Sequence, residues 1–126
     1  MAPPPIIIDL VEHFARNADV YRNSLNEAEV RVQFIDPFFE ALGWDIYNKQ
    51  HYAETYKDVS REYSIQSGPH TEAPDYCFRV GGTRKFFVEA KRPAVHISAD
   101  PAPAFQLRSY AWTSKLPLSL LSNFAE

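Results

Sequence analysis

The spacing of apolar residues predicts that the chain begins with helices. A helix from Ile6 to about Ala18 is predicted by apolar residues at the spacing of an amphipathic helix, namely Ile7, Leu10, Val11 and Phe14. A second helix should begin at Ser24-x-x-Glu27, the pattern of a capping box, and end at Gly43. Its predicted buried face carries six apolar residues: Leu25, Ala28, Val32, Ile35, Phe39 and Leu42.

Pro37 interrupts this second helix. Proline lacks a backbone N–H, so we expect a kink there, or a break at which Asp36 caps a new helical segment. The two tryptophans of the chain, Trp44 and Trp112, are interpreted as core residues.

Extended segments follow the helices. The stretch Val59 to Gln66 reads as a first strand, with a turn after it at Ser67-Gly68-Pro69. Aromatic and β-branched residues predict two more strands, from Asp75 to Val80 and from Arg84 to Lys91, with Gly81-Gly82 as a hairpin signal between them.

After a proline-rich loop, the pattern returns to one helix and one strand. The helix should run from roughly Ala104 to Thr113, and the final strand, predicted to be buried, from Leu118 to Phe124. The resulting order α-β-β-β-α-β indicates an α/β fold with a sheet flanked by helices.

The hairpin decides whether two acids share a face of the sheet. Asp75 lies opposite Glu89 only if the loop is odd, for example Gly81-Gly82-Thr83 with Val80 opposite Arg84. A loop of two residues would put the two acids on opposite faces.

Charged residues are predicted to converge on one face of the second hairpin strand. The period of two places Glu89 and Lys91 on one face, and the apolar Phe86, Val88 and Ala90 on the other. Two carboxylates brought together repel one another unless a cation lies between them, and a divalent ion with oxygen ligands, Mg²⁺ first, fits that place. A lysine beside such an ion can hold or deprotonate a water, so the arrangement suits phosphodiester hydrolysis.

These residues resemble a known motif. Pro74-Asp75, Glu89-Ala90-Lys91 and the Gln106-x-x-x-Tyr110 sequence resemble the PD-(D/E)xK nuclease superfamily, with the extension found in its RecB-like and type I restriction members. The chain from roughly Leu25 to Phe124 is also similar to the N-terminal nuclease domain of type IIG restriction-modification enzymes, whose relatives are the motor subunits of type I enzymes. The segments that carry this second likeness are Phe34–Trp44, Val88–Pro93 and Tyr110–Pro117.

The resemblance implies a restriction-endonuclease-like core with a central mixed sheet, and a Mg²⁺-dependent endonuclease that leaves 5′-phosphates. Asp75, Glu89 and the backbone carbonyl of Ala90 would hold one or two Mg²⁺ ions, for which Mn²⁺ could substitute. Lys91 would orient the attacking water. Two helical residues would assist, Gln106 and, from the first core helix, Glu29.

Charge is distributed unevenly along the chain, whose net charge is -3. Residues 1–78 hold 6 basic and 13 acidic side chains, whereas residues 79–115 hold 7 basic and only 2 acidic ones. Double-stranded DNA is the expected partner of this basic half. Within it, Tyr110 shares a helix face with Gln106, and the two side chains could hold a water or a phosphate. The basic residues expected to meet phosphates are Arg79, Arg84, Lys85, Lys91, Arg92, Arg108 and Lys115.

Length and composition predict a single domain spanning residues 1–126. No apolar run is long enough for a membrane span, and the single cysteine, Cys77, excludes an internal disulfide, so a cytoplasmic protein is expected. In the enzymes that it resembles this domain opens a much longer chain. We therefore expect a fragment or module that works with methyltransferase, target-recognition or motor partners.

Three alternatives stay open. One is a repair or mobile-element nuclease built on the same core. A second is a DNA-binding module that has the fold without catalysis, although an intact set of Asp75, Glu89 and Lys91 argues against it. The third is a structural interaction domain of a larger assembly, in which the acids are ordinary surface charge.

Overall fold

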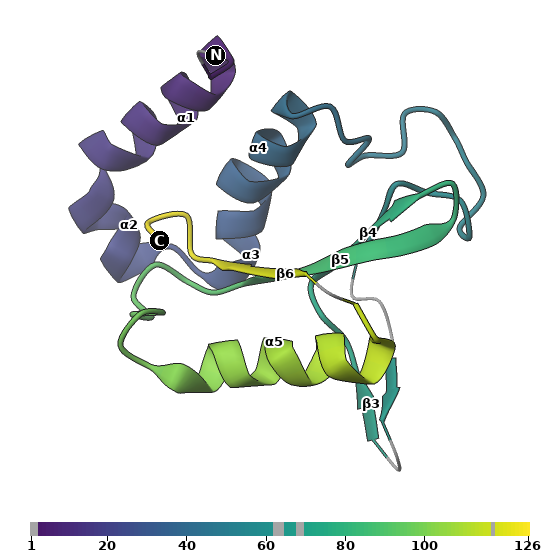
Figure 1. Ribbon diagram of the computed structural model, residues 1–126. Coiled ribbons are helices and arrows are strands. Elements are labelled where there is room, and N and C mark those ends of the chain that lie inside the picture. Colours follow the sequence, from purple (N-terminus) through teal and green to yellow (C-terminus); the bar gives the residue numbers. More distant parts are fainter. Residues whose placement is uncertain (1–2, 62–64, 68–69, 117) are drawn as a thin grey trace.

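A four-stranded mixed sheet with helices on both faces forms the centre of the molecule (Figure 1). The computed structural model describes residues 3–61, 65–67, 70–116 and 118–126. The strands lie in the order β1 (Val59–Arg61), β4 (Tyr76–Val80), β5 (Thr83–Ala90) and β6 (Ser119–Ser122). β6 runs parallel to β5, and the other neighbours are antiparallel. This arrangement confirms the predicted α/β class and is compatible with a restriction-endonuclease-like core.

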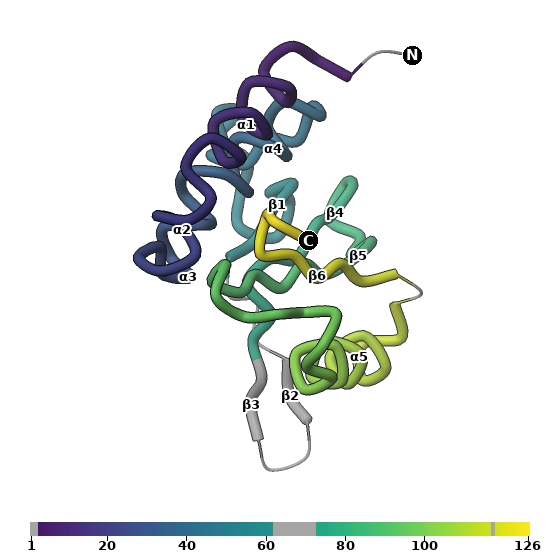
Figure 2. The backbone as a smooth tube through the Cα atoms, turned by 90° about the vertical axis from the view of Figure 1, so that its left-hand side faces the viewer, coloured from purple at the N-terminus to yellow at the C-terminus, as the bar shows by residue number. Residues whose placement is uncertain are grey.

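The helices form two layers, which the view in Figure 2 separates clearly. On one face of the sheet lies α5 (Pro101–Ser114). The opposite face is covered by α1 (Pro5–Arg16), α2 (Ala18–Ser24), α3 (Glu27–Val30) and α4 (Asp36–Ala41).

Side chains of β4 and β5 alternate between these two layers, as the period of two predicts. Val88 and Ala90 pack in the core beneath the N-terminal helices, where a half-buried Phe86 joins them. Cys77 and Phe87 point the other way and pack against α5. Burial raises the pKa of the Cys77 thiol to about 11, which keeps it protonated.

The second predicted helix begins later than expected. Ser24 ends α2, and its hydroxyl donates to the Val20 carbonyl. The capping box is formed instead by Asn26 and Glu29, because the Asn26 side chain accepts from the Glu29 N–H at 2.8 Å while Glu29 accepts from the Asn26 N–H at 3.4 Å. Glu27 is thereby released from the capping role that the sequence predicted for it.

Of the two expectations at Pro37, a kink or a break, the break does not occur. A π-helical turn, η1 (Arg31–Ile35), carries α3 directly into α4, and the Asp36 N–H donates to the Arg31 carbonyl five residues earlier. Asp36 therefore lies inside the helix and does not cap it. Its buried carboxylate accepts hydrogen bonds from the side chains of Arg61 and Tyr76.

The same turn changes which residues are buried. Of the predicted face, Val32 and Leu42 are 66% and 51% exposed, whereas Val30 and Phe34 are completely buried. Because a π turn contains an extra residue, the apolar positions before and after it cannot follow one 3.6-residue period. Three predicted residues do lie in the core: Leu25, Ile35 and Phe39.

A tight loop of two residues joins β4 to β5. Val80 pairs with Thr83, and the intervening Gly81 and Gly82 have φ values of 57° and 81°. Positive φ at both positions is what the favoured two-residue hairpin turn requires. The loop therefore has two residues, and not the odd number on which the shared face of Asp75 and Glu89 was expected to depend.

A β-bulge at Lys85 nevertheless brings the two acids to the same face. The ladder passes from the pair Arg79–Arg84 to the pair Phe78–Phe86, so Lys85 is the extra residue. This extra residue restores the parity that a two-residue loop removes. Tyr76 then pairs with Val88, and one position further on Asp75 lies opposite Glu89.

The described residues of the first predicted strand fall into two strands, β1 and β2 (Ile65–Ser67), and residues 62–64 between them are not among the described ones. With β3 (His70–Glu72), β2 forms a separate antiparallel hairpin in which Ser67 pairs with His70. Residues 68 and 69 of the predicted turn lie outside the described residues.

The C-terminal helix begins earlier than predicted. The Asp100 side chain accepts from the Ala102 N–H at 3.0 Å, and prolines are tolerated in a first helical turn. On this helix Trp112 is 86% exposed, so its assignment to the core is wrong. Trp44 does pack edge to face against Phe78, with ring centres 5.0 Å apart.

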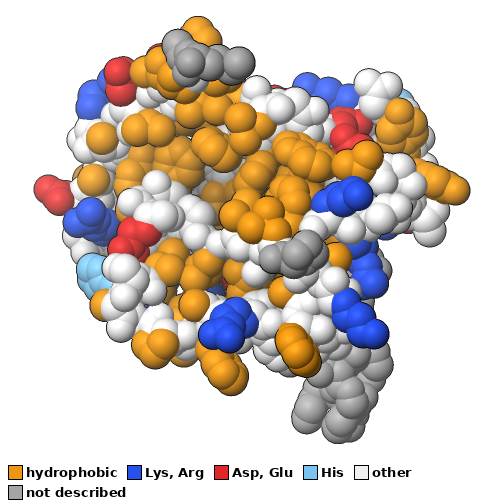
Figure 3. Space-filling view, in the orientation of Figure 1, with side chains coloured by type: hydrophobic (Ala, Val, Ile, Leu, Met, Phe, Trp, Pro, Cys, Tyr) orange, Lys and Arg blue, Asp and Glu red, His pale blue; other side chains and the backbone are white. Residues whose placement is uncertain are grey.

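The final strand, β6, is half-exposed and does not have the buried environment that was predicted. Beside it Figure 3 shows hydrophobic side chains around a hollow of about 330 Å³, whose lining includes Phe38, Leu120 and Phe124. Within the described part of the chain, every helix is too short or too polar to cross a bilayer.

Candidate metal centre

Three carboxylates from separate elements meet beside the sheet. Asp75 directly precedes β4, Glu89 lies near the end of β5, and Glu27 is the first residue of α3. One oxygen from each lies within 4.8 Å of the others. The hairpin register supplies the first two acids, and the short helix supplies the third.

Asp75 is buried and held from two sides. Its Oδ2 atom accepts the backbone N–H of Ala90 at 2.7 Å, and its Oδ1 atom lies 3.4 Å from Nη1 of Arg31. These contacts fix the orientation of the carboxylate before any ligand arrives. Arg31 was not singled out by the sequence, because it lies in the acidic half of the chain.

Glu89 has less support. The residue is 5% exposed and its carboxyl group is hydrogen-bonded to that of Asp75, but its Oε2 atom has no hydrogen-bond partner among the described residues. Burial, together with the neighbouring Asp75 carboxyl group, raises the pKa of Glu89 to about 9, and Lys91 offsets only part of this effect. Burial and the charge of Asp75 also raise the pKa of Glu27. The cluster therefore has too little positive charge for three ionised acids.

This donor set fits a hard divalent cation. Carboxylate oxygens are the ligands that Mg²⁺ and Mn²⁺ prefer, and an unpaired buried oxygen on Glu89 is available as a ligand atom. Asp75, Glu89 and Glu27 are the side chains that could hold it. The predicted participation of the Ala90 carbonyl stays a prediction.

Glu29 does not take part in this cluster, although the sequence analysis expected it to. Its side chain is exposed and engaged in the capping box with Asn26. Glu27, two residues earlier on the same helical turn, reaches the site in its place. The sequence does contain a second capping-box pattern, Asn26-x-x-Glu29, which showed that either glutamate could be the one engaged in capping.

Replacing these glutamates should separate their roles. Glu27→Gln removes a candidate ligand, so we expect weaker Mn²⁺ binding in isothermal titration calorimetry with little loss of stability. Glu29→Ala removes half of the capping box and should lower the free energy of unfolding by about 0.5 to 1 kcal/mol without changing Mn²⁺ affinity. If Glu29→Ala weakened Mn²⁺ binding and Glu27→Gln did not, Glu29 would be the ligand, as the sequence analysis expected.

Lys91, whose charge acts on Glu27 and Glu89, shares a hollow with Gln106. This hollow of about 440 Å³ lies between the end of β5 and the start of α5. Lys91 is half-buried. Its positive charge offsets part of the rise that burial causes in the pKa values of Glu27 and Glu89. Gln106 donates its Nε2–H to the Tyr110 hydroxyl at 2.7 Å, as their predicted common helix face allows.

The predicted DNA-contacting residues have different environments. Tyr110 is 5% exposed as a residue and packs in the core beneath α5, which corrects the expectation that it contacts phosphate. Arg79 is buried and donates to the carbonyls of Glu54 and Lys57, which indicates a structural role and corrects the expectation that it meets phosphate. Arg84 is half-buried. The remaining basic residues are exposed: Lys85, Arg92, Arg108 and Lys115.

Comparison with known proteins points to restriction and modification. The chain is 42% identical, over 118 residues, to the type II restriction enzyme and methyltransferase RM.Eco57I of Escherichia coli. The match covers 91% of this chain but spans only 12% of that protein's length. No family model matches the chain, and no solved structure does. The similarity supports the resemblance to restriction-modification enzymes drawn from the sequence motifs.

Proposed function

We propose that this chain is the metal-dependent DNA-cleaving module of a restriction-modification system. The observation that carries the proposal is the cluster of Glu27, Asp75 and Glu89, which has an unpaired buried oxygen and Lys91 beside it. The similarity to a type II restriction enzyme and methyltransferase supports DNA as the substrate.

The three carboxylates would hold Mg²⁺, or Mn²⁺ in its place, with the Ala90 carbonyl as a further ligand. When bound, such an ion draws electron density from a phosphate oxygen, lowers the pKa of a bound water and stabilises the leaving oxygen. The chain prepares the site by holding Asp75 between the Ala90 N–H and Arg31. This fixed carboxylate limits the reorganisation needed on binding.

Lys91 and Gln106 act on the substrate side. The Lys91 ammonium group would donate a hydrogen bond to the attacking water and so orient it, and the hollow that it lines is large enough for water and a phosphate oxygen. Gln106, held by Tyr110, offers its carbonyl oxygen to that water. Cleavage leaves a 5′-phosphate.

The exposed basic residues Lys85, Arg92, Arg108 and Lys115, with Arg84, would contact the DNA backbone. Such contacts give affinity without reading sequence. Target choice would then depend on a methyltransferase, target-recognition or motor partner. The relative's much greater length and its named methyltransferase activity support that division of labour.

The direct test is cleavage of supercoiled plasmid in Mg²⁺ by the unmodified protein and by Asp75→Asn. We expect nicked or linear products from the unmodified protein, and loss of at least about a hundredfold in rate for the variant, because the substitution removes a charged ligand. Magnesium removal by a chelator should have the same effect. Equal cleavage by both proteins would exclude this site as the source of activity.

If neither protein cuts, calorimetric titration with Mn²⁺ decides whether the site is competent. Binding by the unmodified protein that is lost in Asp75→Asn would indicate a metal site that needs a partner for cleavage. An absence of metal binding in both would contradict the proposal and favour a structural domain.

A further inference from the structure

A groove with two arginines in its walls begins beside the carboxylate cluster. Its first part is a hollow of about 490 Å³ between η1 and β1, with Arg31 and Arg61 among its lining residues. Arg31 also contacts Asp75 at 3.4 Å. The hollow therefore opens next to the candidate metal centre.

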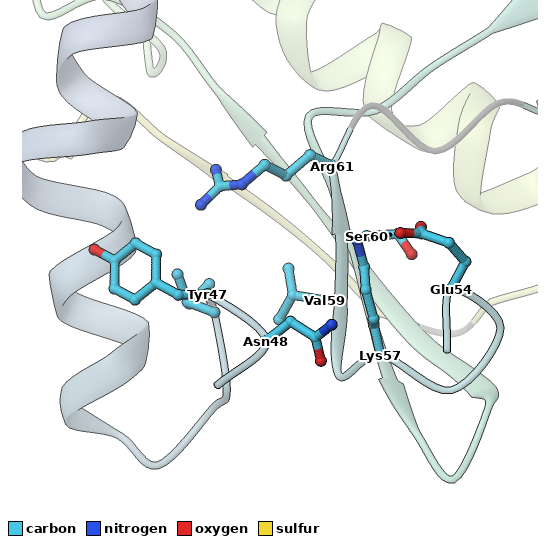
Figure 4. Close-up of a pocket in the computed structure, with 8 residues that line it drawn as sticks. Tyr47, Asn48, Glu54, Lys57, Val59, Ser60 and Arg61 are labelled. Atoms are coloured by element: carbon cyan, nitrogen blue, oxygen red, sulfur yellow. Dashed lines mark hydrogen bonds and ion pairs between the residues drawn. The ribbon is translucent and has the colours of Figure 1, made fainter. Parts of the chain in front are cut away.

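The groove continues past Arg61 into a second hollow of about 340 Å³ (Figure 4). Tyr47 and Arg61 line both hollows, and the second adds the polar side chains of Asn48, Lys57 and Ser60. Figure 4 shows Arg61 extending from its strand toward the side on which Tyr47 lies. The two hollows, joined at Tyr47 and Arg61, form one path that leads away from the carboxylates and becomes more polar along its length.

Arg61 is held in a fixed orientation at the middle of this path. Its Nη1 and Nη2 atoms donate to the Asp36 carboxylate at 3.2 and 2.7 Å, and its guanidinium lies 5.5 Å from the centre of the Tyr76 ring. Asp36 takes two of the five N–H donors that a guanidinium carries. Because the position is fixed beforehand, a ligand that binds Arg61 loses little side-chain entropy.

The exposure of Arg61 argues against a purely structural role. Arg79, which binds backbone carbonyls within the fold, is 6% exposed as a residue. The Arg61 side chain is 40% exposed although its Asp36 partner is buried. A guanidinium needed only to neutralise Asp36 could be as buried as Arg79 is, whereas Arg61 faces the open groove.

We propose that this groove holds the DNA backbone next to the cleaved bond, with Arg31 and Arg61 each binding a phosphate group. The inference rests on the proposed nuclease function and adds a phosphate-binding path to it. The guanidinium fork matches the oxygens of a phosphodiester. Both acids in the described lining are already paired, Asp36 with Arg61 and Glu54 with Lys57, so an incoming phosphate meets no unpaired carboxylate there.

The test measures the binding of a fluorescently labelled DNA duplex by anisotropy at several KCl concentrations. All proteins carry Glu89→Gln, so that the DNA stays intact during the titration. Arg31→Gln and Arg61→Gln should each weaken binding about tenfold at low salt and reduce the slope of log Kd against log salt by about one. Arg61→Lys keeps the charge without the fork and should recover part of the loss.

Arg16→Gln is the matched control, because Arg16 is an exposed arginine at the end of α1 and lines neither hollow. It should change Kd by less than about twofold. Since Arg61 contacts a buried acid, thermal unfolding is recorded for every variant. If Arg61→Gln does not fold, Arg31→Gln and Arg61→Lys carry the comparison.

The outcomes separate this inference from the proposed function. If the parent binds DNA and the folded arginine variants keep its Kd and salt slope, the groove is not the binding path and only this inference is overturned. If the parent binds no DNA at any salt concentration, the proposed function fails and the inference fails with it.

Discussion

Lys91→Ala is expected to abolish cleavage of supercoiled plasmid while divalent-metal binding persists. Lys91 lies beside the carboxylates but supplies no ligand oxygen, so its removal should take away the charged donor that orients the attacking water. Removal of one such preorganised donor typically lowers the rate by about 10² to 10³. Single-turnover cleavage in Mg²⁺, with Mn²⁺ calorimetry on the same protein, measures both properties.

Lys49→Ala is the matched control for this substitution. Lys49 pairs with Glu40 at 3.2 Å on the surface, where its side chain is 70% exposed, and it lines no part of the candidate site. Its removal should leave the cleavage rate unchanged. Normal cleavage by Lys91→Ala would show that another group activates the water.

Asp36→Ala should lower the free energy of unfolding by about 1 to 3 kcal/mol, the cost typical of leaving a buried donor, here the Tyr76 hydroxyl, without its acceptor. Asp36 is 2% exposed and accepts hydrogen bonds from both Arg61 and Tyr76. Burial and the hydrogen bond to Asp36 raise the pKa of Tyr76 above its ordinary value, so the tyrosine stays a neutral donor. Without the carboxylate, both donors lose their acceptor.

Urea unfolding followed by circular dichroism measures this effect, with Asp19→Ala as the comparison. Asp19 is an exposed residue in the first turn of α2, so its replacement should change stability by less than about 0.5 kcal/mol. A loss below about 1 kcal/mol for Asp36→Ala would mean that water replaces the carboxylate readily.

The pattern of the sequence predicted the sheet well because strand alternation is a local property. It placed Phe86, Val88 and Ala90 against one core, and Glu89 on the other face, as the structure shows. The convergence of Asp75 and Glu89 was also correct in outcome. Its predicted cause was wrong, because a bulge at Lys85 corrects the parity, and a solvent-exposed lysine gives no sign of a bulge.

The helical part of the candidate site was harder to predict, because it depends on competition between neighbouring residues. Ser24 and Asn26 can both cap a helix, and each has a glutamate three residues later. In the structure Asn26 is the capping residue, so Glu29 is engaged in the capping box and Glu27 reaches Asp75 and Glu89. Which pair would form depends on tertiary packing, which a local motif does not contain.

The π turn η1 makes the position of Glu27 in the site depend on the number of residues in the helix from α3 to α4. An α-helix turns by about 100° per residue, so losing one residue there would rotate α3 by that angle relative to α4. Glu27 would then swing away from Asp75, while Asp36 and Phe39 stayed in place. In related proteins with the same site, we therefore expect insertions and deletions in this helix to be rarer than substitutions of its exposed residues.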